Sequence, residues 1–242
     1  YFTNWYTSDL QKLNLDTWEI EAEIPMPGLP ENIIIYNDML YISIPLHEDW
    51  SDNNLVAQIN PFNDTLVELY DVGLGPGELL EYNDEIYISR TYYDDSWNAF
   101  YGTSKINIDG SVVIAEYGSG AVCGGGIYRY QDSVYRTYNG GIAKINDDLE
   151  VMPETRLGDY YPEEVYSAEI IGESIYFGLS DFIGEDEVAV VNSEGIEVSR
   201  YAVGTIPGDF AIWTPCSLTG DLNYDNFINI SDIIIMIDMI LY

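Results

Sequence analysis

Oxygen-bearing residues recur at fixed intervals near the C-terminus. The donors are Asp221, Asn223, Asp225, Phe227 (through its carbonyl), Asn229 and Asp232, at positions 1, 3, 5, 7, 9 and 12 of one segment. Calcium takes about six to eight oxygen ligands, and a loop with donors at every second position can curl around it. The spacing therefore predicts a Ca²⁺ loop, and Asp232 also begins a predicted helix over residues 231–241.

Aromatic residues form a second candidate site, in predicted loops that also carry Asp and Asn. One loop reads PLHEDWSDNN and the other reads TYYDDSWNAFYGT. The candidate ligand-binding residues are Trp5, Trp50, Tyr92, Tyr93, Trp97 and Tyr101. Such rings can stack on sugars while neighbouring polar groups bond the hydroxyls, or they can form the hot spot of a protein interface. The alternative is that these loops fold over and bury their own rings.

Two carboxylates, Glu78 and Asp209, fall at the same position of an internal repeat, at the start of a predicted inner strand. The other copies have Asn32, Gly126 and Ser167 there. Facing each other in a central channel, the two acids could act as acid and base in glycoside hydrolysis, or hold a cation or water. The only histidine is His47, and no GxSxG, phosphate loop or CxxC motif is present. We therefore expect a binding protein rather than an enzyme, with a carbohydrate-active hydrolase as one alternative.

The elements that would position these residues are repeated. A hydrophobic residue followed by Asn recurs with the Asn at positions 14, 60, 107, 146 and 192, so the spacings are 46, 47, 39 and 46. An aliphatic residue followed by Tyr recurs at Tyr41, Tyr87, Tyr135 and Tyr176, and Tyr1 stands at the equivalent place in a fifth copy. Each copy contains about four short strand candidates, which is typical of a propeller blade.

The second copy shows the four strands well, over residues 78–82, 85–91, 103–108 and 111–117, with turns at 83–84 and 109–110. The chain opens instead with three strands, near residues 1–5, 10–15 and 19–26. The missing strand is predicted at residues 209–213, where it would complete the first blade and close the ring. The sequence thus predicts an all-β, five-bladed β-propeller over residues 1–215, and a calcium loop with a helix over residues 216–242.

Two segments resemble known families. The sequence GLGPGELLEYNDEIYIS (residues 73–89) resembles repeats of bacterial extracellular propellers of the YVTN and NHL-like kind, in which a G-x-x-P turn precedes the inner strand. The third copy departs from this pattern, with Cys123 and three glycines in place of the turn. The sequence GDLNYDNFINISDIIIMIDMIL resembles one dockerin type I repeat, which has Asp rather than Glu at position 12. Dockerins carry two repeats and bind cohesins, whereas this chain has one copy.

Charge limits the partners and the location. The chain has 42 acidic and 8 basic residues and a net charge of -34, so it repels nucleic acid and anionic membranes. No apolar run reaches membrane-spanning length. The acidity suits a salty exterior, and we expect a secreted, extracellular or cell-surface protein. Cys123 and Cys216 are either a disulfide or two small buried residues.

The predicted terminal helix is apolar nearly all round, so it must be buried against something. It would pack on its own propeller, on a second copy, or on a protein partner. The leading expectation is a calcium-stabilised binding or assembly module that recognises a protein or a glycan through its aromatic loops. A structural subunit of a surface layer or fibre is a further alternative.

Overall fold

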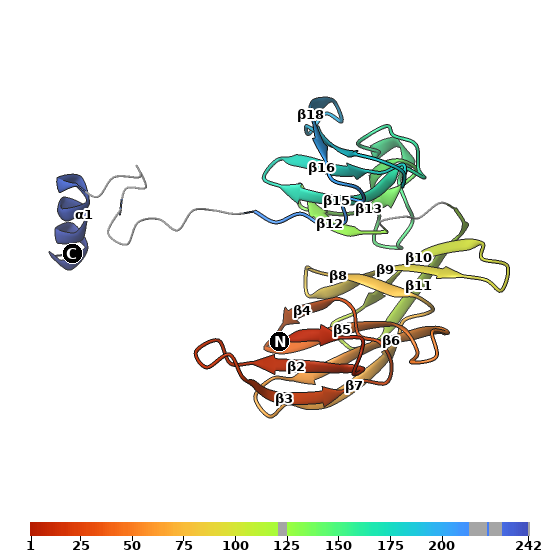
Figure 1. The fold of residues 1–242 in the computed structure, drawn as a ribbon, viewed down its shortest axis with the longest axis horizontal. Helices are drawn as coiled ribbons and strands as arrows, with labels where there is room; N and C mark the ends of the chain where they lie inside the picture. The colour runs from red at the N-terminus through yellow and green to blue at the C-terminus, as the bar shows by residue number, and fades with distance from the viewer. Residues whose placement is uncertain (121–124, 213–221, 223–228, 242) are drawn as a thin grey trace. The chain divides into compact units, whose positions relative to one another are not determined.

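The structure is a computed structural model that describes residues 1–120, 125–212, 222 and 229–241. These residues form five antiparallel sheets and the helix α1 (Ile230–Leu241) (Figure 1). They belong to two compact units, Tyr1–Asp209 and Phe210–Tyr242. The predicted boundary at residues 215 and 216, Cys123 and Cys216 lie outside the described residues. None of the described helices has the length and apolar character that crossing a bilayer would need.

The first three sheets follow one another along the chain. Sheet one contains β1 (Phe2–Asn4), β2 (Asp9–Leu13) and β3 (Ile20–Pro25). Sheet two contains β4 (Ile33–Tyr36), β5 (Met39–Leu46), β6 (Asp52–Asn60) and β7 (Thr65–Asp71). Sheet three contains β8 (Pro76–Tyr82), β9 (Glu85–Tyr93), β10 (Ala99–Ile106) and β11 (Val112–Ser119). The four strands predicted for the second copy are all present in sheet three.

The last two sheets continue the same meander. Sheet four contains β12 (Ile127–Tyr130), β13 (Ser133–Tyr138) and β14 (Gly141–Lys144), and a short 3₁₀-helix follows at Pro153–Thr155. Sheet five contains β15 (Val165–Ile171), β16 (Ser174–Leu179), β17 (Asp186–Val191) and β18 (Glu197–Val203). Within every sheet, strands that are consecutive in the chain are hydrogen-bonded neighbours.

The turns between the first two strands of a repeat explain the local fold. In sheet three the turn residues Asn83 and Asp84 both have positive φ, at 53° and 64°. Two consecutive left-handed residues define the type I′ turn, whose twist matches that of the flanking strands, and Asn and Asp tolerate it better than other residues with a Cβ. Asn37 and Asp38 do the same in sheet two. The predicted turn at residues 83–84 is therefore confirmed.

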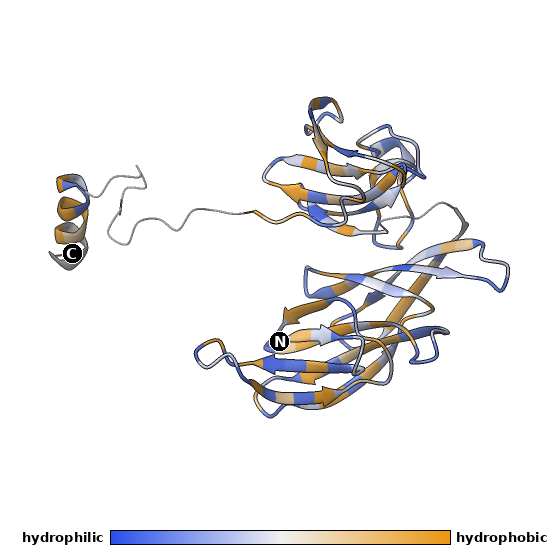
Figure 2. Cartoon of the chain, in the orientation of Figure 1, coloured by the Kyte–Doolittle hydropathy of each residue, from blue (hydrophilic) through white to orange (hydrophobic). Residues whose placement is uncertain are grey.

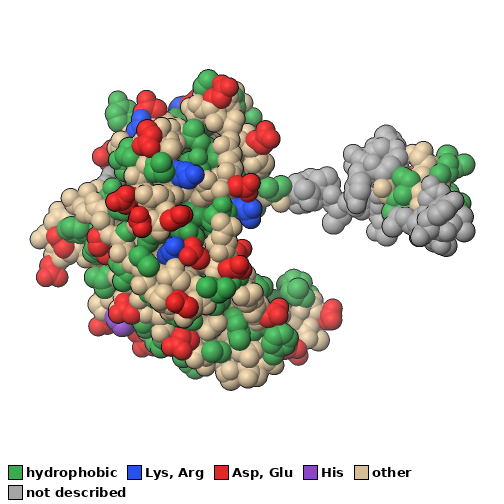
Figure 3. Space-filling model, turned by 180° about the vertical axis from the view of Figure 1, so that it is seen from behind, with side chains coloured by type: hydrophobic (Ala, Val, Ile, Leu, Met, Phe, Trp, Pro, Cys, Tyr) green, Lys and Arg blue, Asp and Glu red, His purple; other side chains and the backbone are tan. Residues whose placement is uncertain are grey.

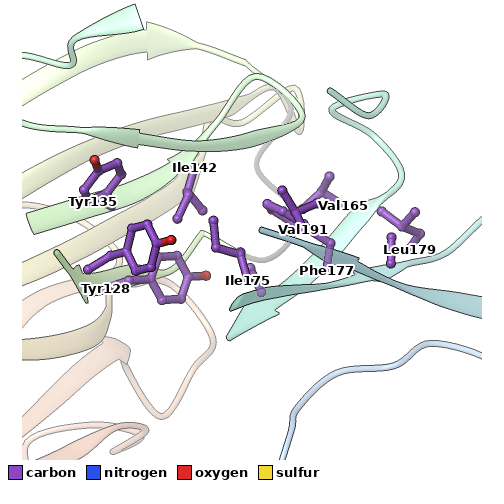
Figure 4. Packing of buried hydrophobic residues seen from close by; sticks show 11 residues of the cluster. Tyr128, Tyr135, Ile142, Val165, Ile175, Phe177, Leu179 and Val191 are labelled. Atoms are coloured by element: carbon purple, nitrogen blue, oxygen red, sulfur yellow. The ribbon is translucent and has the colours of Figure 1, made fainter. Parts of the chain in front are cut away.

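The hydrophobic core lies between successive sheets. Hydrophobic and hydrophilic residues alternate along many strands, so the buried side chains gather on the sheet faces (Figure 2). One buried cluster joins sheets one and two, a second joins sheets two and three, and a third joins sheets three and four. The fourth joins sheets four and five, with Tyr128 and Ile142 against Ile175 and Phe177 (Figure 4). The sheets therefore pack face to face in chain order.

The prediction of a strand that closes the ring is wrong for the residues that the structure describes. Over the described part of residues 209–213, which is 209–212, the chain has no strand, and sheet one keeps three strands. The physical reason is that residues from Phe210 onward belong to the other compact unit, and Ile212 is 64% exposed rather than buried on a sheet. The chain does return to sheet five just before this point, because the Ser167 hydroxyl donates a hydrogen bond to the Pro207 carbonyl.

Candidate functional site: an acidic cavity and a row of aromatic hairpins

A cavity of about 580 Å³ lies where five segments of the chain meet. β8, β12 and β15 each line it, together with the residues just before β4 and residues 208–209. Its carboxylates are those of Glu31, Glu78, Glu169 and Asp209. The structure therefore brings the predicted pair, Glu78 and Asp209, to the same cavity.

Glu78 is the most perturbed of these acids. Burial raises its pKa to about 7, and the charges of Glu169, Asp209 and Glu31 act in the same direction. The backbone N–H of Ile127 donates a hydrogen bond to Glu78 Oε2 at 3.2 Å, which opposes the rise by stabilising the carboxylate. The carboxyl group of Glu78 is therefore partly protonated at neutral pH.

Sequence reasoning missed Glu31 and Glu169, because it compared only the one position that the repeats share. Burial raises the pKa of both groups, and the charge of Asp209 adds to the rise at Glu169. A signal for Glu169 was present in the sequence. Glu169 lies two residues after the shared position at Ser167, and residues two apart on a strand point to the same face.

The shared position also carries hydrogen bonds between neighbouring sheets. Asn32 Oδ1 accepts a hydrogen bond from the Leu79 N–H at 3.2 Å, just as Glu78 Oε2 accepts one from the Ile127 N–H. Leu79 and Ile127 occupy equivalent places, one residue after that position in their own repeats. An acceptor here therefore connects one sheet to the start of the next, which is a structural role for Glu78.

The second candidate site begins with two hairpin loops of the same design. In the β5–β6 loop the N–H of Trp50 donates to the His47 carbonyl, and in the β9–β10 loop the N–H of Trp97 donates to the Asp94 carbonyl. Both tryptophans have positive φ, at 67° and 62°. Their side chains are 66% and 81% exposed. The loops therefore present two indoles to solvent from the same place in consecutive sheets.

Other hairpins of this design show what the backbone prefers at that place. The same hydrogen bond is made by Gly110 in the β10–β11 loop and by Gly195 in the β17–β18 loop. Their φ angles are 80° and 79°. Left-handed geometry costs a residue with a Cβ about 1 kcal/mol or more, whereas glycine adopts it freely. Leu149 makes the same hydrogen bond with φ of 64° and is fully buried, so a residue with a Cβ stands at this place where its side chain has a role.

The two loops are held by their own carboxylates. Asp94 accepts hydrogen bonds from the N–H groups of Ser96 and Asn98 at 2.9 and 2.8 Å. Asp49 accepts one from the Ser51 N–H at 3.1 Å. These bonds, with those from the Asn98 amide and the Ser51 hydroxyl, lower the pKa of both carboxyl groups, so they stay ionised below neutral pH. Trp50 directly follows Asp49, and Trp97 lies three residues after Asp94. Each indole is therefore close in sequence to an ionised carboxylate that hydrogen bonds hold in place.

Further contacts join the loops into one surface. Trp5, from the β1–β2 loop, lies 5.6 Å from Trp50 in a T-shaped pair. Tyr93 lies 6.2 Å from Trp97, and its backbone N–H is hydrogen-bonded to the carboxylate of Asp52 at the start of β6. Trp5, Trp50, Tyr93 and Trp97 are therefore two aromatic pairs on the loops of sheets one, two and three, together called the aromatic row below.

Tyr92 and Tyr101 were also predicted to contact a ligand, and both are half-buried, with their rings against other side chains of the protein. The Tyr92 ring stacks on Phe100 at 5.6 Å, and its hydroxyl donates to Glu116 at 2.9 Å. The Tyr101 ring lies 5.2 Å from the guanidinium of Arg136, which is fully buried. The rings that face solvent are thus a subset of those predicted.

Of the predicted calcium ligands, Asp221, Asn223, Asp225 and Phe227 lie outside the described residues. Asp232 is buried, and its two oxygens accept hydrogen bonds from the N–H groups of Leu222 and Asn229 at 2.7 and 2.8 Å. Asn229 Oδ1 accepts one from the Ser231 N–H, which completes a reciprocal cap at the start of α1. One carboxylate thus connects the second and ninth positions of the predicted loop.

Comparisons with known proteins address the fold. No known protein family and no curated protein matches the sequence. Among solved structures, the dihydro-heme d1 dehydrogenase NirN in complex with DHE shares 14% identity and a TM-score of 0.51, over 82% of this chain and 43% of NirN. A Kluyveromyces lactis Hsv2 with loop 6CD replaced by a Gly-Ser linker shares 10% identity and a TM-score of 0.50, over 83% of this chain and 62% of Hsv2.

Both of these neighbours are β-propellers. This chain spans less than two thirds of the length of either one, and identities this low bear on the fold alone. Five antiparallel sheets, each packed on the next in chain order, agree with that likeness. The chain has a β-propeller fold.

Proposed function

We propose that the protein is a binding module, and that the aromatic row (Trp5, Trp50, Tyr93 and Trp97) is its ligand-contacting surface. The observation that supports this is the left-handed backbone at Trp50 and Trp97. Backbone strain of this kind clusters at functional sites, although Trp18 in the β2–β3 loop has it too. Two equivalent loops of consecutive sheets each hold an exposed indole in this backbone conformation, and this favours recognition over packing.

The loops also suit binding because they are already ordered. Aspartate side chains bond the backbone within each loop, so little conformational entropy is lost when a partner docks. Trp and Tyr present large surfaces with few rotatable bonds, which is why they dominate interface hot spots. Both a protein partner and a glycan fit this description.

The test uses panels of immobilised peptides and oligosaccharides, probed with the wild type and with the double variant Trp50→Leu/Trp97→Leu. The matched control is Trp18→Leu. Trp18 is 75% exposed with φ of 60°, but it lies in the β2–β3 loop, at the other end of its sheet. We expect wild type and control to bind the same probes and the double variant to lose them. Equal binding by all three proteins would remove the aromatic row from the proposal.

The C-terminal unit is proposed to bind Ca²⁺ through Asp221, Asn223, Asp225, the Phe227 carbonyl, Asn229 and Asp232, and to dock through α1 onto a protein partner or a second copy. Support comes from the spacing of the donors and from the buried Asp232 carboxylate that connects Leu222 to Asn229. Calorimetric titration with Ca²⁺, repeated on Asp232→Asn, should give binding only in the wild type. Light scattering with and without chelator then tests self-association. Secretion to the cell exterior is part of the same proposal, on the acidity of the chain.

The ring is proposed to hold five blades. The cavity supports this, because the three inner strands β8, β12 and β15 line it together with the segments before β4 and at residues 208–209. A cysteine pair placed at Thr3 and Asp209 would test whether the end of the unit reaches sheet one. Rapid disulfide formation is expected if the ring closes, and free thiols in the folded protein would count against closure.

One observation favours a second candidate, a carbohydrate-active hydrolase. An acid with a pKa of about 7 beside a second carboxylate on the same cavity is suited to protonating a leaving oxygen while its neighbour activates water. Reducing-end assays on polysaccharide panels should then show activity that is lost in Glu78→Gln and in Asp209→Asn. Glu19→Gln, at an exposed position in the β2–β3 loop, is the control. Activity that survives both cavity variants would end this candidate.

A further inference from the structure

Most cations of this protein share one environment. Five of its 8 Lys and Arg residues lie over a tyrosine ring and also pair with a carboxylate. The cation-to-ring distances run from 5.5 to 6.0 Å, which is the range of cation–π contacts. The five groups are Lys12 with Tyr1 and Asp64, Arg90 with Tyr92 and Glu116, Lys105 with Tyr87 and Glu85, Arg129 with Tyr82 and Asp132, and Arg200 with Tyr160 and Glu197.

This combination is a small cation receptor built from two parts. The ring offers its negative face and the carboxylate offers a charge-assisted hydrogen bond. At Lys105 the ammonium lies 5.6 Å from the Tyr87 ring centre and 3.0 Å from a Glu85 oxygen. The chain uses both Lys and Arg in this way, so the receptor selects for positive charge rather than for one side chain.

The aromatic row carries the same two parts but no Lys or Arg, and the one basic residue of its loops is His47. Its three loops, residues 4–8, 47–51 and 94–98, contain no Lys or Arg. They contain Glu48, Asp49, Asp94 and Asp95, and the ionised carboxylates of Asp49 and Asp94 are fixed by hydrogen bonds within the loops. Indole is a better cation acceptor than phenol. The row therefore offers exposed rings on loops that carry fixed negative charge, without the Lys or Arg found with a ring and a carboxylate in the five groups above.

The whole surface adds to this preference. The chain carries 34 more negative than positive charges, and acidic side chains are scattered over the viewed face with few basic ones among them (Figure 3). Such a field attracts basic partners from a distance and repels anionic ones, including sulfated or uronate-rich glycans. Neutral sugars gain nothing from it. Charge therefore discriminates among the occupants that an aromatic surface by itself would admit.

We infer that the aromatic row binds a basic segment of another protein, with Lys or Arg side chains stacked on the indoles of Trp50 and Trp97 and paired with the loop carboxylates. The inference rests on the proposed function, since it names the ligand class of the same surface. It goes further because it excludes neutral and anionic glycans as the principal ligand.

The probe is a fluorescent peptide of six Gly-Arg repeats, and its citrulline analogue is the uncharged isostere. We expect the wild type to bind the arginine peptide at about 0.15 M salt, and the citrulline peptide at least about tenfold more weakly. Trp50→Leu/Trp97→Leu leaves every charge in place, so it should lose about tenfold in affinity through cation–π contacts alone. Trp18→Leu should bind as the wild type does.

Each alternative outcome has a definite meaning. Equal affinity of the double variant and the wild type would show unspecific attraction by net charge and would overturn the inference. Binding of neutral oligosaccharides that depends on Trp50 and Trp97, without peptide binding, would overturn the inference and leave the proposed function standing. Absence of any ligand that depends on the two tryptophans, in both panels, would overturn both.

Discussion

Trp50 and Trp97 occupy the same place in consecutive hairpins, each donating its N–H to the carbonyl three residues earlier and each with positive φ. Glycine holds that place in two other hairpins of the same protein, and the buried Leu149 holds it in a third loop. The protein itself thus supplies the comparison between a loop built only for folding and a loop that presents a side chain.

Replacing either tryptophan by glycine should separate stability from binding. Trp97→Gly relieves left-handed strain of about 1 kcal/mol, so the melting temperature should stay unchanged or rise by about 2–4 °C. Ligand binding should fall at the same time. Calorimetric melting and the peptide titration measure the two effects. A marked drop in melting temperature would mean that the indole is part of the protein's own packing.

Gly102 should not tolerate a side chain. A Cβ there would lie 2.4 Å from Arg90 Nη2 and 2.5 Å from the Ala115 carbonyl oxygen, and the carbonyl cannot move without disturbing the β10–β11 pairing. We expect Gly102→Ala to lower the free energy of unfolding by about 1–3 kcal/mol. Gly184→Ala is the control, because nothing lies within 4 Å of its Cβ position. Similar denaturant midpoints for the two variants would contradict the packing described between β9 and β11.

Glu78 should make stability depend on pH near neutrality. Its pKa is about 7 in the folded protein against 4.5 in the unfolded chain, so the folded state binds more protons between these values. Stability should therefore fall as pH rises from 4.5 to about 7. Glu78→Gln should reduce this slope and raise stability at pH 8 by on the order of 1 kcal/mol, since solvent in the cavity screens the charges.

The measurement for Glu78 is urea unfolding at several pH values for the wild type and Glu78→Gln. Because glutamine keeps an oxygen for the Ile127 N–H, the substitution changes charge more than it changes hydrogen bonding. Parallel stability curves for the two proteins across this pH range would show that Glu78 has an ordinary pKa.

Asp232 should govern the order of α1. Its carboxylate accepts hydrogen bonds from the N–H groups of Leu222 and Asn229, and losing a cap of this kind costs about 1 kcal/mol. In hydrogen-exchange mass spectrometry of the full chain, Asp232→Asn should speed exchange over residues 230–241 while leaving Tyr1–Asp209 unchanged. Removing calcium from the wild type should act in the same direction. Unchanged exchange in the variant would contradict the cap.

The strands were predictable because their signals are local. Alternating hydrophobic residues predict the strands of sheet three, and Asn83 with Asp84 predicts the turn between its first two strands. The structure has β8, this turn and β9 at those places. The closing strand was not predictable in this way, because pairing between the two ends of a unit depends on contacts about 200 residues apart rather than on local pattern. Residues 209–212 accordingly have a strand-like sequence but no strand.

The candidate sites were predictable in part for the same reason. Repeat register placed Glu78 and Asp209 on one cavity, but Glu31 and Glu169 lie off the compared position. Composition marked aromatic loops without distinguishing the exposed Trp97 from Tyr101, which packs against Arg136. That distinction depends on Arg136 reaching across from the next sheet, which no pattern within the loop can indicate.

The most direct test of the aromatic row is ¹⁹F NMR of protein labelled with 5-fluorotryptophan and titrated with the Gly-Arg peptide. The chain has 5 tryptophans, so single substitutions can assign every resonance. The account predicts that the resonances of Trp50 and Trp97 shift and saturate together while that of Trp18 stays in place. Shifts of equal size at Trp18, or none at Trp50 and Trp97 on a peptide that binds, would contradict it.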